Sequence, residues 1–360
     1  MTRIARTNVL ILGLATAILI LTGANNTFAF QEKISPLSDY QYKRDFAQYE
    51  TIKKEADNQK RTDALLDFIK TRPISRILLY AATDYLTAVK PHMDQKDWAK
   101  ALSMQEALWA ALPTPESVQA AGIPAGTEEF LKDQLVPTQK LVLSNMLQVY
   151  LQSNNMPKAA ETTEKLYAIA PDKALLPVMA NIYLGMKNYD KFLEYGQKIL
   201  AETSMEQGYT LALQMAQVYL QKNDVPNAIA LLTKVMDVYG DKMPPNVQEP
   251  QWNATRAFAY GVMASQVYAT KDYAKSLELY EKVIKFDPKR EDAYYYTGMC
   301  KWQNKDPEGA IEAFAKAVVL NKDLGKKAQT YLEDLYKARH GGSLDGLDQV
   351  LAKAKAGLGL

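Results

Sequence analysis

Apolar and polar residues follow one another along this chain with the spacing of helices. Stretches rich in Leu, Ala, Tyr and other apolar residues, such as residues 98–112 and 141–151, recur from about residue 40 onward. No long segment shows the strict every-second-residue alternation that is typical of a half-buried strand. The pattern therefore predicts an all-α chain made of many short amphipathic helices.

Five Asn or Asp residues each end one helical stretch and begin the next. They are Asn155, Asn188, Asp224, Asp272 and Asp306, and the spacings between them are 33, 36, 48 and 34 residues. An Asx side chain accepts a hydrogen bond from a free backbone N–H in the first turn of a helix, and proline is tolerated in that turn. Because the spacing stays near 34 residues, the sequence predicts a stack of helical hairpins.

Small residues recur at two further places when each unit is numbered with its Asx as the sixteenth position. The eighth position holds Leu147, Ala180, Ala216, Ala264 and Gly298, and the twentieth holds Ala159, Phe192, Ala228, Ser276 and Ala310. Small side chains allow two antiparallel helices to approach closely. Pro171 and Pro288, at the thirty-second position, are expected to stop the second helix of their units.

This pattern resembles the tetratricopeptide repeat, in which large, small and aromatic residues and a proline occupy these places. The resemblance implies an α-solenoid with five units over residues 140–172, 173–208, 209–256, 257–290 and 291–324. The last unit matches best, with Tyr294, Gly298 and Phe314 in register. The unit from residue 173 departs from the pattern at Phe192 and Gly196.

Two weaker units precede these five. Asp57 and Pro73, and Asp97 and Pro113, repeat the same 16-residue distance from cap to proline, so residues 30–113 are predicted to form degenerate hairpins. This gives about seven hairpins, followed by C-terminal capping helices over residues 325–360. Residues 114–139 and 240–253 interrupt the array and are interpreted as linkers. The alternative for the second interruption is that Met243 and Trp252 pack over the groove or over the adjacent hairpin.

The N-terminus predicts export. Arg3 and Arg6 precede an apolar core at residues 9–21, and residues 1–29 fit a signal peptide cleaved after Ala29 or after Ala24. An uncleaved N-terminal anchor is the alternative, although the apolar core is short for a membrane span. With a leader, a helical repeat and a single cysteine, Cys300, we expect an exported bacterial protein of the periplasm.

Composition argues against several classes of function. The chain has 43 basic and 41 acidic residues, and they are interleaved, so nothing resembles the clustered cations of a nucleic-acid-binding surface. The two histidines and one cysteine form no metal-ligand spacing, and no nucleophile or phosphate-binding motif is present. We therefore predict no enzymatic activity, no cofactor, no metal site and no nucleic-acid partner.

The resemblance also implies where a partner would bind. In the family, the second, fifth, ninth and twelfth positions of the first helix line the concave surface. The candidate residues here are Ser144, Gln148, Asn181, Gln217, Ser265, Tyr268, Tyr295, Met299 and Trp302. Four of the five ninth positions are polar and uncharged, and a row of amides can hydrogen-bond a peptide backbone. The alternative is that Gln and Asn are merely tolerated on a solvated helix face.

The sequence therefore predicts a non-catalytic scaffold of the bacterial envelope that binds an extended segment of a protein or peptide. The alternative is an inner-membrane-tethered assembly factor, which contacts the membrane only if the leader stays uncleaved. The identity of the partner does not follow from these patterns.

Overall fold

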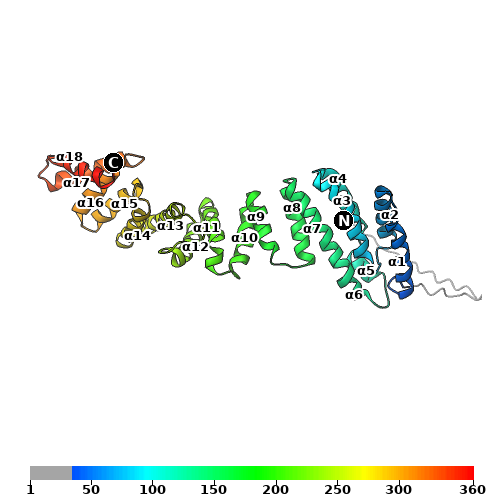
Figure 1. Cartoon of the computed structure of the whole chain (residues 1–360). Helices are drawn as coiled ribbons and strands as arrows, with labels where there is room; N and C mark the ends of the chain where they lie inside the picture. Colours follow the sequence, from blue (N-terminus) through cyan, green and yellow to red (C-terminus); the bar gives the residue numbers. More distant parts are fainter. Residues whose placement is uncertain (1–34) are drawn as a thin grey trace, which may run out of the picture.

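The computed structural model describes residues 35–360, which form an elongated array of helices with no strand in that part of the chain (Figure 1). Seven consecutive helical hairpins make up most of it, in agreement with the predicted solenoid of about seven units. Their helices are α1 (Asp39–Lys53) and α2 (Asn58–Thr71), α3 (Leu78–Asp94) and α4 (Trp98–Ala111), α7 (Val136–Gln152) and α8 (Met156–Ile169), α9 (Leu175–Gly185) and α10 (Tyr189–Leu200), α11 (Met205–Gln221) and α12 (Val225–Tyr239), α13 (Glu249–Ala269) and α14 (Tyr273–Phe286), and α15 (Glu291–Gln303) and α16 (Pro307–Leu320).

In each hairpin, the second helix begins at an Asn or Asp that the sequence pattern predicts as its N-terminal cap. The side chains of Asn155, Asn188, Asp224, Asp272 and Asp306 each accept a hydrogen bond from the backbone N–H three residues later, at the start of the second helix. Asp57 and Asp97 cap α2 and α4 in the same way. These bonds satisfy one of the free donors of each helix start, so the same short turn recurs along the array.

The residue before most of these caps adopts a left-handed backbone. Lys96, Asn154, Lys187, Asn223, Lys271 and Lys305 have φ values between 57° and 65°. This conformation ends the first helix and lets the backbone N–H of the cap bond back to a carbonyl of that helix, as Asn188 does to Tyr183 over 2.9 Å. The turn therefore closes without glycine in the hairpins from α3 to α16.

Small residues at the eighth and twentieth positions lie in the core, as predicted. Ala180, Ala216, Ala264 and Gly298 are buried at the eighth position, and Ala159, Ala228 and Ala310 at the twentieth. At Gly298 a Cβ atom would lie 2.7 Å from the ring of Phe314, so only glycine fits against that ring. The irregular unit compensates in a similar way: Phe192 is fully buried, and Gly196 leaves room for the Met215 sulfur.

The first interruption of the array is more ordered than the predicted linker 114–139. It contains α5 (Pro115–Ala120) and α6 (Thr127–Phe130), followed by a π-helical turn, η1 (Leu131–Leu135), that continues directly into α7. Phe130, Leu135 and Thr138 are buried, which explains why the helix starts before residue 140. The boundary of the unit predicted at 140–172 is therefore too late.

The second interruption is shorter than the predicted 240–253, because α13 already begins at Glu249. Trp252 packs against the hairpin before it: its ring centroid lies 6.0 Å from those of Tyr209 and Tyr239, and its indole N–H donates to the Tyr239 carbonyl over 3.2 Å. Met243 remains exposed. Trp252 is buried against the preceding hairpin, and α13 therefore includes residues that come before the first position of its unit.

The two ends of the array are closed differently. At the C-terminal end, α17 (Gly325–Arg339) and α18 (Leu347–Gly357) both pack on α16, and Leu332, Leu347 and Leu358 are buried there. These helices are the predicted caps. Pro171 and Pro288 lie just beyond the ends of α8 and α14, as expected for residues that stop a helix.

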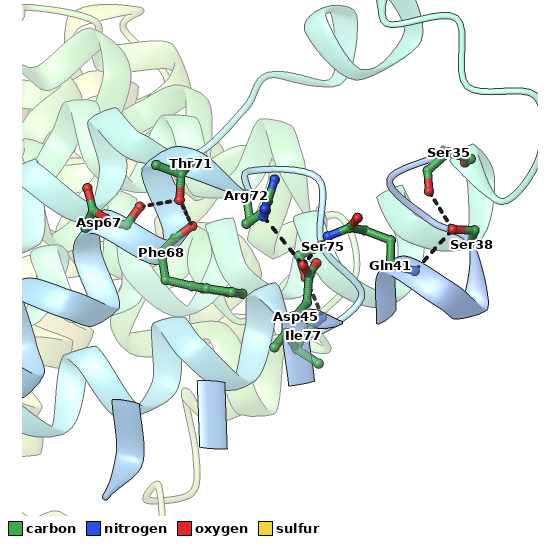
Figure 2. A network of polar contacts seen from close by, with 10 residues as sticks. All are labelled: Ser35, Ser38, Gln41, Asp45, Asp67, Phe68, Thr71, Arg72, Ser75 and Ile77. Carbon is green, nitrogen blue, oxygen red and sulfur yellow. Dashed lines mark hydrogen bonds and ion pairs between the residues drawn. The ribbon is translucent and has the colours of Figure 1, made fainter. Parts of the chain in front are cut away.

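At the other end, α1 attaches through polar groups. Its inward face consists of Gln41, Asp45 and Tyr49. The Asp45 carboxylate is 1% exposed and accepts hydrogen bonds of 2.6 Å from both the Gln41 amide and the Ser75 hydroxyl, with the Arg72 guanidinium 3.6 Å away (Figure 2). Tyr49 donates to Asp84 over 2.6 Å. A buried carboxylate needs such partners, so Asp45 anchors α1 to the loop between α2 and α3.

Replacing Asp45 with Ala is expected to lower the free energy of unfolding of the N-terminal hairpin by about 2 to 4 kcal/mol, because Ser75, Gln41 and Arg72 lose their shared partner. Hydrogen exchange measured peptide by peptide would show faster exchange confined to residues 39–53. The control is Asp39→Ala, since that carboxylate is 88% exposed and its ion pair with Arg76 contributes less than about 1 kcal/mol. Unchanged protection of α1 in Asp45→Ala would contradict the anchoring role.

Candidate functional site

The register of the first helices is held by a repeated tyrosine contact. Tyr150, Tyr183 and Tyr219 occupy the eleventh position of their units and are buried. The first two donate to Glu106 and Glu164, over 3.2 and 2.7 Å, and the Tyr219 hydroxyl accepts from Gln197 over 2.8 Å. Each of these partners lies at the twenty-fifth position of the preceding hairpin. The contact therefore fixes each of α7, α9 and α11 against the unit before it.

Two of these tyrosines also have altered acidity. Burial, together with the neighbouring Glu106 carboxylate, raises the pKa of Tyr150 to about 12. Burial and Glu164 raise the pKa of Tyr183 as well. Because ionisation is disfavoured in the folded state and occurs near pH 10 in the unfolded chain, stability is full below pH 10 and falls as the pH rises toward 12.

We expect Tyr150→Phe to weaken this alkaline destabilisation. The variant is less stable than the parent protein at pH 8, because the bond to Glu106 is lost. Between pH 8 and pH 11 it loses about 1 kcal/mol less, because one titrating group has been removed. Urea unfolding at both pH values measures the difference. Glu106→Gln, which keeps a hydrogen-bond acceptor and removes the charge, should give a smaller change in the same direction. Equal losses in all three proteins would refute the assignment.

The side chains predicted to bind a partner separate into two groups. Ser144, Gln148, Asn181, Gln217 and Ser265 are all exposed. They lie on α7, α9, α11 and α13, the first helices of four successive hairpins. Gln148, Asn181, Gln217 and Ser265 hold the same position in four successive units, and equivalent positions of a stacked repeat recur on the same side of the array.

The second group is taken up by packing at the C-terminal end. Tyr295, predicted to bind a partner, is only 8% exposed, so little of its side chain is accessible from outside. Its ring packs against Tyr296 and Phe314 and lies 6.1 Å from the ring of Tyr331 on the capping helix α17. The sequence pattern of one unit does not show this, because the covering residue comes from the cap.

The neighbours of Tyr295 are partly covered as well. Trp302 is 41% exposed, with its ring centroid 5.7 Å from that of Tyr331. Met299 is half-buried in the same cluster. Tyr268 is half-buried between Tyr273 and Tyr296, with ring centroids 5.5 and 5.1 Å away. The candidate face is therefore open over α7, α9 and α11 and becomes aromatic and partly closed from α13 onward.

A second row accompanies the first. The twelfth positions of the same four helices hold Leu151, Leu184, Leu220 and Tyr268, which are exposed or half-buried. We call the two rows together the first-helix face: Gln148, Asn181, Gln217 and Ser265 with Leu151, Leu184, Leu220 and Tyr268. It combines hydrogen-bonding amides with apolar side chains, the two kinds of contact from which protein interfaces are built.

A hollow at the α7 end of the first-helix face is lined by residues of two first helices. It has a volume of about 520 Å³ and lies between α3 and α7. Asn145, Gln148 and Gln152 line it from α7, and Leu86, Lys90 and Met93 line it from α3. The ninth positions of two first helices, Lys90 and Gln148, thus open into one groove. The contribution of α3 does not follow from the sequence pattern, because the hairpin that contains α3 matches the repeat only weakly.

The single cysteine of the chain lies in the core of the array. Cys300 is fully buried, and burial raises the pKa of its thiol, as expected for a residue that packs as a small hydrophobe. Among residues 35–360, no group of three His, Cys, Asp or Glu is placed to hold a metal ion. No helix in this range is both long and apolar enough to span a membrane.

Comparison with known families supports the repeat. Residues 263–324 match the family model of the tetratricopeptide repeat, which covers α15, α16 and most of the hairpin before them. This part of the chain is similar to the tetratricopeptide repeat, which is a helical repeat rather than an enzyme family. No curated protein matches the sequence.

Several solved structures are similar at low identity. MamA from Desulfovibrio magneticus RS-1 shares 17% identity at a TM-score of 0.33, over 51% of this chain and 94% of that chain. YrrB, described as a TPR protein with an unusual peptide-binding site, shares 15% at 0.38, over 60% and 100%. The TPR2AB domain of yeast Sti1, in a complex with pHSP90, shares 14% at 0.33, over 88% and 100%.

Proposed function

We propose that this protein is a non-catalytic scaffold that binds an extended segment of a protein partner along the first-helix face. The observation that supports this proposal is the exposed row of Gln148, Asn181 and Gln217 on three successive first helices. Amide side chains both donate and accept, so they can pair with the backbone of an extended chain whatever its side chains are. The apolar row beside them offers contacts for the partner's side chains.

The face is also suited to binding because it is rigid. The tyrosine contacts tie α7, α9 and α11 to their neighbours, and the Asx caps fix the turn at the end of each. A preformed surface loses little conformational entropy when a ligand docks on it. A scaffold of this kind needs no catalytic group and no cofactor.

We expect the triple substitution Gln148→Ala, Asn181→Ala and Gln217→Ala to reduce partner capture by about tenfold or more, since each lost amide bond contributes on the order of 1 kcal/mol. The measurement is recovery of the proteins that co-purify with the parent protein from its native cells. The matched control changes three exposed lysines on the second helices, Lys158→Ala, Lys198→Ala and Lys234→Ala. Equal capture by both variants would rule out the amide row as the binding element.

The proposed place of action is the bacterial cell envelope, most simply the periplasm. This rests on the charged start and apolar core of residues 1–29, which lie outside the residues that the structure describes. The alternative is an assembly factor tethered to the inner membrane by an uncleaved leader. Its support is the same apolar core, at residues 9–21.

N-terminal sequencing of the protein recovered from the envelope fraction separates the two. A mature start at Phe30 or at Asn25 is expected for a periplasmic scaffold. An intact Met1, with the protein retained in the membrane pellet after a high-salt wash, would instead establish the tethered form. Recovery in the cytoplasmic fraction alone would exclude both.

A further inference from the structure

Charged residues in the middle of the array are almost confined to one of the two helices of each hairpin. The first helices α7, α9, α11 and α13 carry only four charged residues: Lys140, Glu206, Glu249 and Arg256. The second helix α8 alone carries four: Lys158, Glu161, Glu164 and Lys165. Charged residues make up 23% of the whole chain. The first helices are therefore depleted of charged residues, including on their exposed sides.

None of these four charged residues lies on the first-helix face. Lys140 is at the first position of its unit, and Glu206 and Glu249 precede the first position of theirs. Arg256 is 7% exposed, with its guanidinium 4.7 Å from the centre of the Phe286 ring. Charge returns only at the rim, where the first helices end, at Lys187, Lys222 and Lys271. Of these, Lys222 already pairs with Asp190 over 2.7 Å.

The ion pairs of this region follow the same division. Glu161 is held between Lys158 and Lys165 on α8, at 2.9 and 2.8 Å. Glu194 pairs with Lys198 on α10 over 2.8 Å. These ion pairs lie on the second helices α8 and α10, whose charged side chains stay in contact with water. The exposed first-helix face has amides and apolar groups but no charged residue of its own. Only at its α7 end do charged side chains of α3, Lys90 and Asp94, line the same groove as Gln148.

We propose that the first-helix face selects an uncharged extended polypeptide segment, with apolar side chains at alternate positions, and rejects segments that carry Lys, Arg, Asp or Glu. This rests on the proposed peptide-binding function and specifies its ligand. In an extended segment every second side chain points to the same side, so one set meets the apolar row. The backbone then lies along the amides.

The selection works chiefly by exclusion. A charged side chain that is pressed against this face loses water and gains no opposite charge, whereas an uncharged one loses little. Amides that bond to any backbone cannot by themselves discriminate between sequences, so the penalty on charge supplies the specificity. Binding through such a face should also be insensitive to salt, because screening acts on charge pairs.

The test uses purified protein and three immobilised sets of twelve-residue peptides with the same apolar residues at alternate positions. The intervening residues are Ser and Gln in all three sets. Two of the apolar residues are replaced by Lys in the basic set and by Glu in the acidic set, so that the charge faces the protein. We expect the neutral set to be bound about tenfold or more tightly than either charged set, and equally well at low and at high salt.

A charge-reversal experiment completes the test. Gln148→Glu combined with Gln217→Glu should weaken binding of the neutral set and create salt-sensitive binding of the basic set. The matched control is Ala230→Glu, at an exposed site on the second helix α12, which should bind like the parent protein. Circular dichroism of all three proteins confirms that the helices are intact.

The outcomes separate this inference from the proposed function. If the charged sets bind the parent protein as tightly as the neutral set, selection against charge is wrong while peptide binding stands. If an uncharged oligosaccharide binds and displaces the neutral peptides, the face is not specific for polypeptide. If no peptide set binds at all, both the inference and the proposed peptide-binding function are overturned.

Discussion

The structure depends on one packing constraint: a helical hairpin can bury its apolar side only against the hairpins next to it. The helices must therefore approach closely at every step, and the residues at the points of approach are small. Gly298 against Phe314 is the tightest case at the eighth position, where a single added carbon would meet the ring. Where one unit departs from the pattern, Phe192 is fully buried, and the missing side chain at Gly196 leaves room for the Met215 sulfur.

The same constraint explains the ends of the array. The C-terminal hairpin would expose α16, and both α17 and α18 cover it with apolar residues. The first described helix, α1, buries two polar side chains, Gln41 and Asp45, beside Tyr49. It is held instead by a buried carboxylate with three polar partners. Hydrogen bonds and ion pairs depend on geometry more than apolar packing does. The N-terminal end is therefore more sensitive to a small displacement of a side chain than the C-terminal end.

Within each hairpin the two helices have different roles. The second helices carry the ion pairs that keep the array solvated, and they supply the acceptors or donors that meet the eleventh-position tyrosines. The first helices are tied down by those tyrosines and present an almost uncharged surface. This division produces a firmly held face that differs chemically from the rest of the molecule, which is the basis of the function proposed for it.

The hairpins and their turns follow from local features of the sequence. Asn155, Asn188 and Asp224 act through bonds to residues three positions away, and Ala180 or Ala216 through contact with the partner helix of the same unit, so a local pattern is enough to place them. Tertiary structure decided what lies beyond one unit. The burial of Tyr295 depends on α17, the anchoring of Trp252 on Tyr209, and the α3 wall of the groove on a weakly patterned hairpin. Such contacts join residues distant in the chain, and no period in the sequence records them.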